Sequence, residues 1–325
     1  MSRRPISTPL VFVSVAWAAV LLATHRPANA APTSRPAVAA AKTPGHPRSQ
    51  RRAWPAHYPK IRYWEYAATA ASFGVLAYVQ FGVYTRRVPS WEGGILFDDA
   101  VRDGLRLKTR SGREKAGLTS DVFWGLTWAL PTVDMILLPI LDRSFTLFWQ
   151  LAWMNALVYG TVAATSRVMH KVTKRARPLW EGCKEEGAGY DAGCDGAPSD
   201  FFSGHTAVSA AAAGLTCVHH QFLPLYGKRW ADTTACASAL TSAAAVGLFR
   251  ILADRHYTSS VLIGYAVGFS IGYGLPWLLH YRRPARGFGK EGAFKSVQPK
   301  APPTTAIVTP FGSEDRLGLQ LVGQF

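Results

Sequence analysis

Six apolar stretches follow one another after residue 62, and they restrict the possible folds more than any other feature. They cover residues 66–85, 122–141, 145–166, 201–227, 233–249 and 257–281. Each is close to the ~20 residues that a helix needs to cross the hydrocarbon layer of a membrane. A soluble domain built from such helices would have too few polar faces toward water. The sequence therefore predicts an all-α bundle of six transmembrane helices over residues 63–285.

Both ends of the chain differ in composition from this predicted domain. A pair of arginines, an apolar run at residues 10–23 and small residues shortly after it have the order of an export signal. The run is shorter than a membrane span, so residues 1–30 are predicted to be a signal peptide, with an uncleaved anchor helix as the alternative. Residues 31–62 are rich in proline, alanine and arginine and are predicted to be a disordered linker. The C-terminal tail, residues 286–325, contains two short runs that can pair as a hairpin, 306–310 and 317–322.

The chain carries 36 Lys and Arg against 20 Asp and Glu, a formal net charge of +16. Much of the excess lies near the N-terminus, where no acidic residue precedes Glu65. A nucleic-acid interface needs its basic residues on a folded surface. We therefore predict no nucleic-acid partner, and the sequence points to no protein partner; the expected surroundings are the lipid bilayer.

If all the apolar stretches cross the membrane, the connections after the third and the fifth face the same side. These connections cover residues 167–200 and 250–256. Three polar groups lie in or beside them: residues 170–178, residues 202–205, and the pair Arg250 and His256. Arginine side chains bind phosphate oxygens in pairs, amides at a helix N-terminus add donors, and imidazoles can attack phosphorus or protonate a leaving oxygen. Together the groups predict a phosphate site.

The three groups resemble, in type and order, the signature motifs of the type 2 phosphatidic acid phosphatase family, which read Lys-x6-Arg-Pro, Pro-Ser-Gly-His and Ser-Arg-x5-His-x3-Asp. The resemblance is detailed over residues 160–280. It implies the membrane fold of that family and a phosphatase that hydrolyses a lipid phosphomonoester or diphosphate, similar to phosphatidic acid or a prenyl diphosphate. The motifs contain no carboxylate cluster of the kind that holds Mg²⁺, so no metal and no other cofactor is predicted.

In that family, the histidine of the third motif is the nucleophile that becomes phosphorylated, and the histidine of the second protonates the leaving group. By resemblance these roles fall to His256 and His205. The matching phosphate-holding positions are Arg177, Ser203, Gly204 and Arg250. His170 stands where the family has its lysine. We predict that the neighbouring Lys171 helps to hold phosphate, although one residue turns a side chain by about 100° around a helix.

Ser260 stands where the family has the aspartate that orients the nucleophile. A hydroxyl can aim the imidazole but brings no negative charge. The sequence therefore predicts a slow enzyme, in which Ser260→Asp raises kcat by about tenfold or more. This expectation fails if another carboxylate reaches His256, and Asp134 and Asp254 are the nearest candidates along the chain. The alternative function is a relative that binds phosphorylated lipid without turnover; a vanadate-dependent haloperoxidase and a transporter rank below it.

The cysteines bear on the side of the membrane that holds the site. Cys183 and Cys194 flank a loop between the first two motifs, and in an exported loop they are predicted to form a disulfide. Cys217 and Cys236 lie in apolar stretches and are predicted to be core residues. Arg175 is predicted to mark a membrane boundary. A cleaved signal would place the motifs in the cytoplasm, whereas the cysteine pair and the family arrangement place them in the periplasm, which is our prediction for a bacterial-type inner membrane protein.

Overall fold

The computed structural model describes residues 52–84, 88–191, 193–194, 196–282, 306–313 and 316–323. The predicted signal peptide, and the part of the predicted linker before residue 52, lie outside the described residues.

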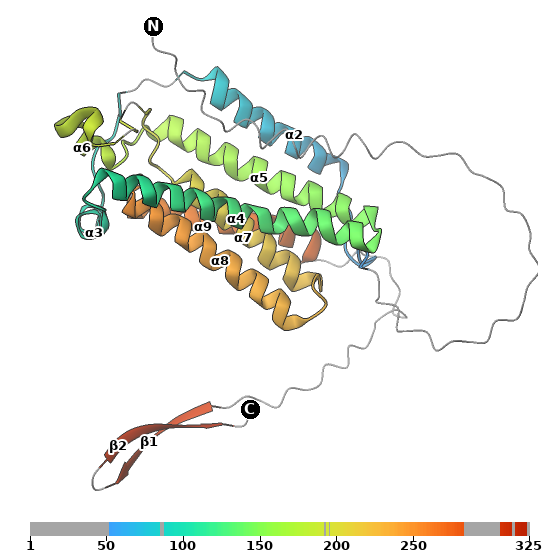
Figure 1. Ribbon diagram of the computed structural model, residues 1–325. Coiled ribbons are helices and arrows are strands. Elements are labelled where there is room, and N and C mark those ends of the chain that lie inside the picture. The colour runs from blue at the N-terminus through green and yellow to red at the C-terminus, as the bar shows by residue number, and fades with distance from the viewer. Residues whose placement is uncertain are drawn as a thin grey trace, which may run out of the picture. The chain divides into compact units, whose positions relative to one another are not determined.

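Six long helices make up the described part of the bundle (Figure 1). They are α2 (Tyr63–Ala77, continued by the π-helix η2, Tyr78–Gly82), α4 (Arg110–Asp142), α5 (Phe145–Thr173), α7 (Gly204–Phe222), α8 (Arg229–Leu252) and α9 (Thr258–Pro276, continued by the π-helix η4, Trp277–Tyr281). Each overlaps one apolar stretch, so the predicted helical bundle is confirmed over these residues. Shorter elements are α3 (Asp98–Leu105), α6 (Leu179–Glu186) and the 3₁₀ turn η3 (Gly187–Gly189). Near the C-terminus, β1 (Ala306–Ser313) and β2 (Arg316–Gly323) pair antiparallel, with Ala306 opposite Gly323.

Three helices in the described part of the chain are long and apolar enough to cross a membrane, which is consistent with a membrane protein. They are Arg110–Asp142, Arg229–Leu252 and Thr258–Tyr281. The predicted count of six spans is not confirmed. The α-helical part of α2 has only 15 residues. In α5 and α7, polar side chains such as Asn155 and His219 are buried among apolar ones and lower the mean hydropathy.

Helix α7 is the centre of the bundle and contacts α4, α5, α8 and α9. Its middle consists of small residues, and the side chains of Ala210, Ala211, Ala212 and Ala213 have no exposed surface. Small side chains allow several helices to approach one another closely. Polar groups at the two ends of α7 are therefore held in fixed positions relative to the neighbouring helices.

The contact between α7 and α9 is a seam of glycines. Gly264, Gly268 and Gly272 recur at every fourth position of α9 and face the backbone of α7. A Cβ atom placed on Gly268 would lie 2.0 Å from the carbonyl oxygen of Ala207, and one on Gly272 would lie 2.2 Å from that of Ala211. Only glycine fits at such distances, so the two helix backbones touch. This seam fixes the start of α9 against the start of α7.

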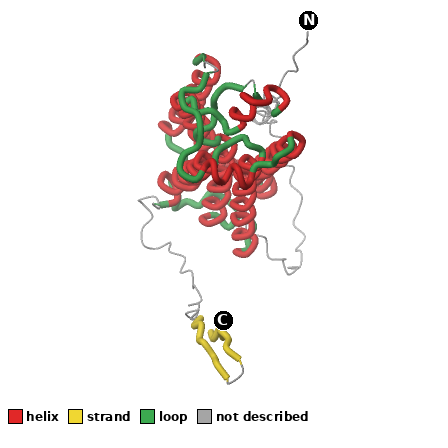
Figure 2. Tube along the Cα trace, turned by 90° about the vertical axis from the view of Figure 1, so that its left-hand side faces the viewer, coloured by secondary structure: helices red, strands yellow, loops and turns green. Residues whose placement is uncertain are grey.

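The connections that carry the three motifs meet at one end of the bundle, beside α3 and α6 (Figure 1). The loops of the bundle crowd at this end of the helices (Figure 2). Backbone hydrogen bonds lock them together: the amides of Asp200, Ser203 and Leu179 donate to the carbonyls of Arg175, Ser260 and Asp254 at 3.1, 3.0 and 3.1 Å. The residues that the sequence motifs single out therefore share one region of the fold.

The other end of α7 is tied by polar contacts and a disulfide. His220 lies between two carboxylates, 2.7 Å from Asp232 and 3.0 Å from Asp134. Cys217 and Cys236 form a disulfide between α7 and α8, with their Cα atoms 4.4 Å apart. Cys217 is buried, as predicted for a core residue, but its disulfide to Cys236 was not predicted. The short turn between α7 and α8 lays the helices side by side, and this brings residues that are 19 positions apart into contact.

Candidate active site

His256 lies in the connection between α8 and α9, and its side chain is 2% exposed. Its Nδ1 atom is 3.0 Å from the backbone oxygen of Asp200 and 3.2 Å from the Oδ1 atom of the same residue. A backbone carbonyl can only accept a hydrogen bond, so Nδ1 carries the proton and donates it. Burial lowers the pKa of His256 well below its ordinary value, and the guanidinium groups of Arg177 and Arg250 lower it further. The imidazole is therefore neutral, with the lone pair on Nε2.

The Asp200 side chain is held from several directions at once. Its Oδ2 atom accepts a hydrogen bond of 2.5 Å from the Ser260 hydroxyl and lies 3.2 Å from Nη1 of Arg175. Its Oδ1 atom accepts from the backbone amide of Tyr257 at 3.1 Å. The side chains of Asp200, Ser260 and Arg175 are completely buried. Burial raises the pKa of Asp200 to about 7, although Ser260 and Arg175 act to lower it.

The carboxylate that contacts His256 belongs to neither of the two candidates named from the sequence, Asp134 and Asp254. Asp134 belongs to the far end of the bundle, where it contacts His220. Asp254 is close in sequence but pairs with Arg102, whose Nε atom is 2.7 Å from Oδ1. The prediction that His256 lacks a carboxylate partner was wrong, because Asp200 reaches it from the segment before α7, and neither of the two candidates named from the sequence is that partner. Its position just before the second motif is the one sequence signal that could have indicated it.

Arg175 occupies the centre of a buried ionic network. Its Nη2 atom is 2.8 Å from Oδ2 of Asp98, and its Nη1 atom donates to the hydroxyls of Ser259 and Ser260 at 3.0 and 3.2 Å. The guanidinium also lies 4.3 Å from the ring centroid of Trp91. Burial acts to raise the pKa of Asp98, but hydrogen bonds from Arg175 and Ser259 lower it overall. The prediction that Arg175 marks a membrane boundary was wrong, since a boundary arginine would be exposed.

His205 is the second residue of α7, and its side chain is 40% exposed. The helix starts here because the Ser203 side chain caps it, accepting from the backbone amide of Thr206 at 3.4 Å. Arg250, near the end of α8, forms an ion pair with Asp121 of α4. The Nε2 atom of His205 is 3.5 Å from the same carboxylate. Asp121 is absent from the motifs, because it lies on a separate helix that carries none of them.

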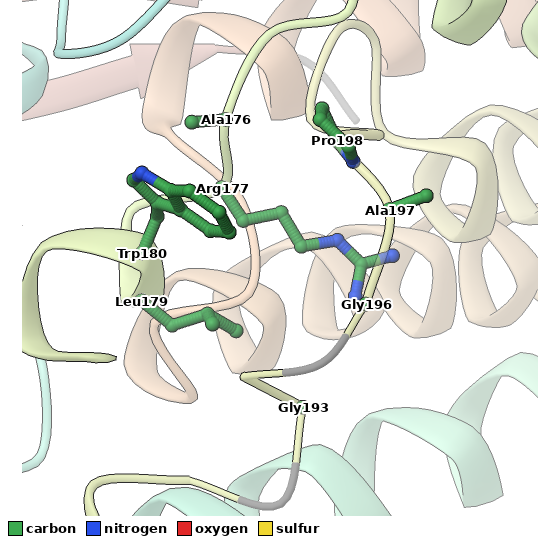
Figure 3. A pocket seen from close by; sticks show the side chains of 8 residues that line it. All are labelled: Ala176, Arg177, Leu179, Trp180, Gly193, Gly196, Ala197 and Pro198. Carbon is green, nitrogen blue, oxygen red and sulfur yellow. The ribbon is translucent and has the colours of Figure 1, made fainter. Parts of the chain in front are cut away.

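Gly204 and Arg177 complete the predicted phosphate-holding group. A Cβ atom on Gly204 would lie 2.9 Å from the hydroxyl of Ser166, so any larger residue at the start of α7 would require the Ser166 side chain to move. Arg177 extends across a small pocket toward the segment that carries Gly196 and Ala197 (Figure 3). Burial and the positive charges of nearby arginines lower the pKa of Arg177 to about 10. A site that crowds guanidinium groups favours an anion.

Lys171 and His170 have separate partners. The Lys171 ammonium donates to the backbone oxygen of Val83 at 2.6 Å. The Nε2 atom of His170 is 2.8 Å from the backbone oxygen of Phe202, next to the second motif. His170 thus contacts the segment of the second motif, and the role of Lys171 as a phosphate ligand remains a prediction. A step of about 100° around the helix turns these two side chains in different directions.

Cys183 and Cys194, the pair predicted from the sequence, form a disulfide with their Cα atoms 5.5 Å apart. The bond ties the end of α6 to the segment that leads back to Asp200. It lies at the same end of the fold as the motifs. The loop that faces the Arg177 pocket is therefore covalently closed.

The family comparison agrees with this geometry. Residues 147–284 match the family model of the PAP2 superfamily, which confirms the resemblance to type 2 phosphatidic acid phosphatases. Members of the superfamily are generally phosphatases, which supports a hydrolase that acts on phosphorylated substrates. Comparison with curated proteins and with solved structures found no match.

Proposed function

We propose that the protein hydrolyses a lipid phosphomonoester or diphosphate through a phosphohistidine at His256. The observation that carries this proposal is the hydrogen bond from Nδ1 to a backbone carbonyl, which leaves Nε2 as a neutral nucleophile. The guanidinium groups of Arg177 and Arg250 act electrostatically on the same imidazole. They supply the positive charge that the phosphoryl oxygens need during transfer.

The two histidines divide the reaction between them. In the first step, Nε2 of His256 bonds to phosphorus while the bond from phosphorus to the leaving oxygen breaks, and His205 gives its proton to that oxygen. The leaving group is the lipid alcohol for a phosphomonoester and the lipid monophosphate for a diphosphate. In the second step, water loses a proton to His205 and attacks phosphorus, the bond to Nε2 breaks, and inorganic phosphate leaves. Both histidines return to their initial states. The exposed position of His205 is suited to an acid that must meet first a leaving group and then water.

A lipid substrate fits the surroundings of His205. Helix α4, one of the helices apolar enough to cross a membrane, brings Asp121 to the site and exposes apolar side chains beside it. These are Leu118, Val122 and Leu126. A lipid tail can pack on this face while the phosphate enters between the cationic groups. The disulfide between Cys183 and Cys194 supports a site on the periplasmic side, since disulfides persist in oxidising compartments.

Phosphate release from purified protein tests the proposal. The substrates are phosphatidic acid, a prenyl diphosphate and a soluble aryl phosphate, each assayed with and without EDTA. We expect activity to survive the chelator, His256→Ala to abolish it, and His205→Ala to leave a trace on the aryl phosphate, whose leaving group needs little protonation. An acid-quenched digest with the phosphoryl group on any residue other than His256 would overturn the proposal. Loss of activity in EDTA with recovery in Mg²⁺ would do the same.

The alternative of a lipid binder without turnover was based on Ser260 and on His170. The contact between Asp200 and His256 supports turnover despite the serine at position 260. Vesicles that contain phosphatidic acid distinguish the two functions: stable binding with no phosphate release would favour the binder.

A further inference from the structure

The nucleophile needs a partner for the charge it acquires. When Nε2 of His256 bonds to phosphorus, the imidazole becomes positively charged while Nδ1 keeps its proton. The His256 side chain is 2% exposed and its Nδ1 atom bonds to Asp200, so water does not offset the charge on that side of the ring. At the position where the family motif has an aspartate, this chain has Ser260.

We propose that Asp200 is the positioning residue of His256, supplying from the segment before α7 the carboxylate that residue 260 lacks. This inference rests on the proposed function and names the residue that supports its nucleophile. The Ser260 hydroxyl donates to Oδ2 of Asp200 at 2.5 Å, so the Asp200 carboxylate reaches the region that a carboxylate on residue 260 would occupy. The charge is thus in the same region but comes from a different segment of the chain.

The hydrogen bonds assign distinct tasks to Ser260 and Asp200. A hydroxyl has one proton to donate, and Ser260 gives it to Asp200, so Ser260 acts on the carboxylate and not on His256. Asp200 turns Oδ1 toward both Nδ1 of His256 and the backbone amide of Tyr257. With Arg175 on Oδ2, neither carboxylate oxygen is free to rotate away from the imidazole.

Charge balance also favours this role. Arg175 is shared between two buried carboxylates, Asp98 and Asp200, so the trio carries one positive and two negative charges when all are ionised. The net charge is then −1, and the positive charge that forms on His256 brings it to zero. Replacing Asp200 by a neutral residue would leave a positive imidazole beside a fully paired Arg175. Asp200 therefore stabilises the phosphorylated state more than the resting state.

Two matched variants test the inference. Asp200→Asn removes the charge at His256, whereas Asp98→Asn removes a carboxylate that is equally buried and also bound to Arg175 but that accepts hydrogen bonds from Ser259 and not from His256. We expect kcat to fall about 100-fold or more in Asp200→Asn with KM changed little, and by far less in Asp98→Asn. In the double variant Asp200→Asn/Ser260→Asp, the carboxylate returns on the other segment, and we expect kcat about tenfold above that of Asp200→Asn. Folded Asp200→Asn with the kcat of Asp98→Asn would overturn the inference.

A second variant keeps the inference testable if Asp200→Asn does not fold. Ser260→Ala retains the carboxylate and removes only one of its donors, so it should lose no more than about tenfold in kcat. Complete loss of activity in folded Ser260→Ala would mean that Ser260 serves His256 directly, and the inference would be wrong.

Orthovanadate provides a readout that does not depend on turnover, because it adopts the geometry of the phosphoryl transition state. We expect the Kd of vanadate to rise about tenfold or more in Asp200→Asn and to stay near the wild-type value in Asp98→Asn. Equal Kd values in all three proteins would contradict the inference. If the wild-type protein releases phosphate from no substrate, the proposed function fails, while the vanadate comparison still decides the role of Asp200. If the wild type is active and only the variants disagree, the inference alone fails.

Discussion

The substitution Ser260→Asp separates the sequence motif from the three-dimensional site. The motif alone predicts faster turnover, because it restores the expected aspartate. In the structure, the new carboxylate would meet Asp200, whose Oδ2 atom is 2.5 Å from the Ser260 hydroxyl, in a completely buried position. Two like charges about 4 Å apart repel by about 4 kcal/mol at an effective dielectric constant of 20. We therefore expect the variant to be less stable and no faster than the wild type.

The loss of stability in Ser260→Asp increases with pH. The folded protein reduces the repulsion by keeping a proton on the pair of carboxylates, so the pair binds more protons in the folded than in the unfolded state. The free energy of unfolding then decreases as pH rises above about 4, by roughly 1.4 kcal/mol for each pH unit, until the raised pKa of the pair is passed. A shift of about three units gives the same 4 kcal/mol as the Coulomb estimate.

Thermal unfolding in detergent, followed by tryptophan fluorescence at pH 5 and pH 8, measures this cost. Ser260→Asn is the control, since it has the shape of the aspartate without its charge. We expect Ser260→Asp to melt about 10 °C below Ser260→Asn at pH 8, and the gap to narrow at pH 5. Equal melting temperatures at pH 8, together with a higher kcat for Ser260→Asp, would refute the placement of Asp200 beside residue 260.

Three further predictions follow from other features of the site. Because burial raises the pKa of Asp200 to about 7, its negative charge is lost at lower pH, and kcat should fall about tenfold per unit below pH 7; a pH profile of Asp200→Asn should lack this limb. Asp121→Asn removes a carboxylate that competes with phosphate for Arg250, so inhibition by inorganic phosphate should become about tenfold stronger, whereas an unchanged inhibition constant would place Arg250 outside the phosphate site. A digest made without reductant should contain the peptide that links Cys183 and Cys194. Labelling of both thiols by an impermeant maleimide only after the membrane is opened would contradict the disulfide and the periplasmic site together.

The sequence predicts those features that depend on local composition. Apolar stretches predict where the long helices lie, and the motif residue His205 falls at the start of α7, where the serine that caps the helix is visible in the sequence. The span count is harder to predict, since α7 is buried by its neighbours and needs no apolar surface toward lipid. The position of a helix can therefore be predicted from the sequence more directly than whether that helix faces lipid or other helices.

The contacts that support the motif residues could not be predicted in the same way. Asp200 reaches His256 across 56 positions, and only the close approach of α7 to α9 brings them together. Arginine is usually a surface residue, because charged side chains are buried only when they are paired. The partner of Arg175, Asp98, is 77 positions away along the chain, so the sequence does not indicate that Arg175 is buried. A motif indicates which side chains perform the chemistry. The residues that position those side chains depend on how the whole chain folds.

The glycine seam between α7 and α9 allows these helices to pack only at certain positions along each other. Each of the three glycines of α9 packs against the backbone of α7. If α9 shifted along α7, the glycines would next match this backbone after four residues, or about 6 Å. Smaller slides would drive a ridge into a neighbouring side chain. His205 lies at the start of α7 and His256 lies just before α9, so the seam also fixes the separation of these two histidines. Changes in substrate preference must then come from surfaces away from the seam, such as α4.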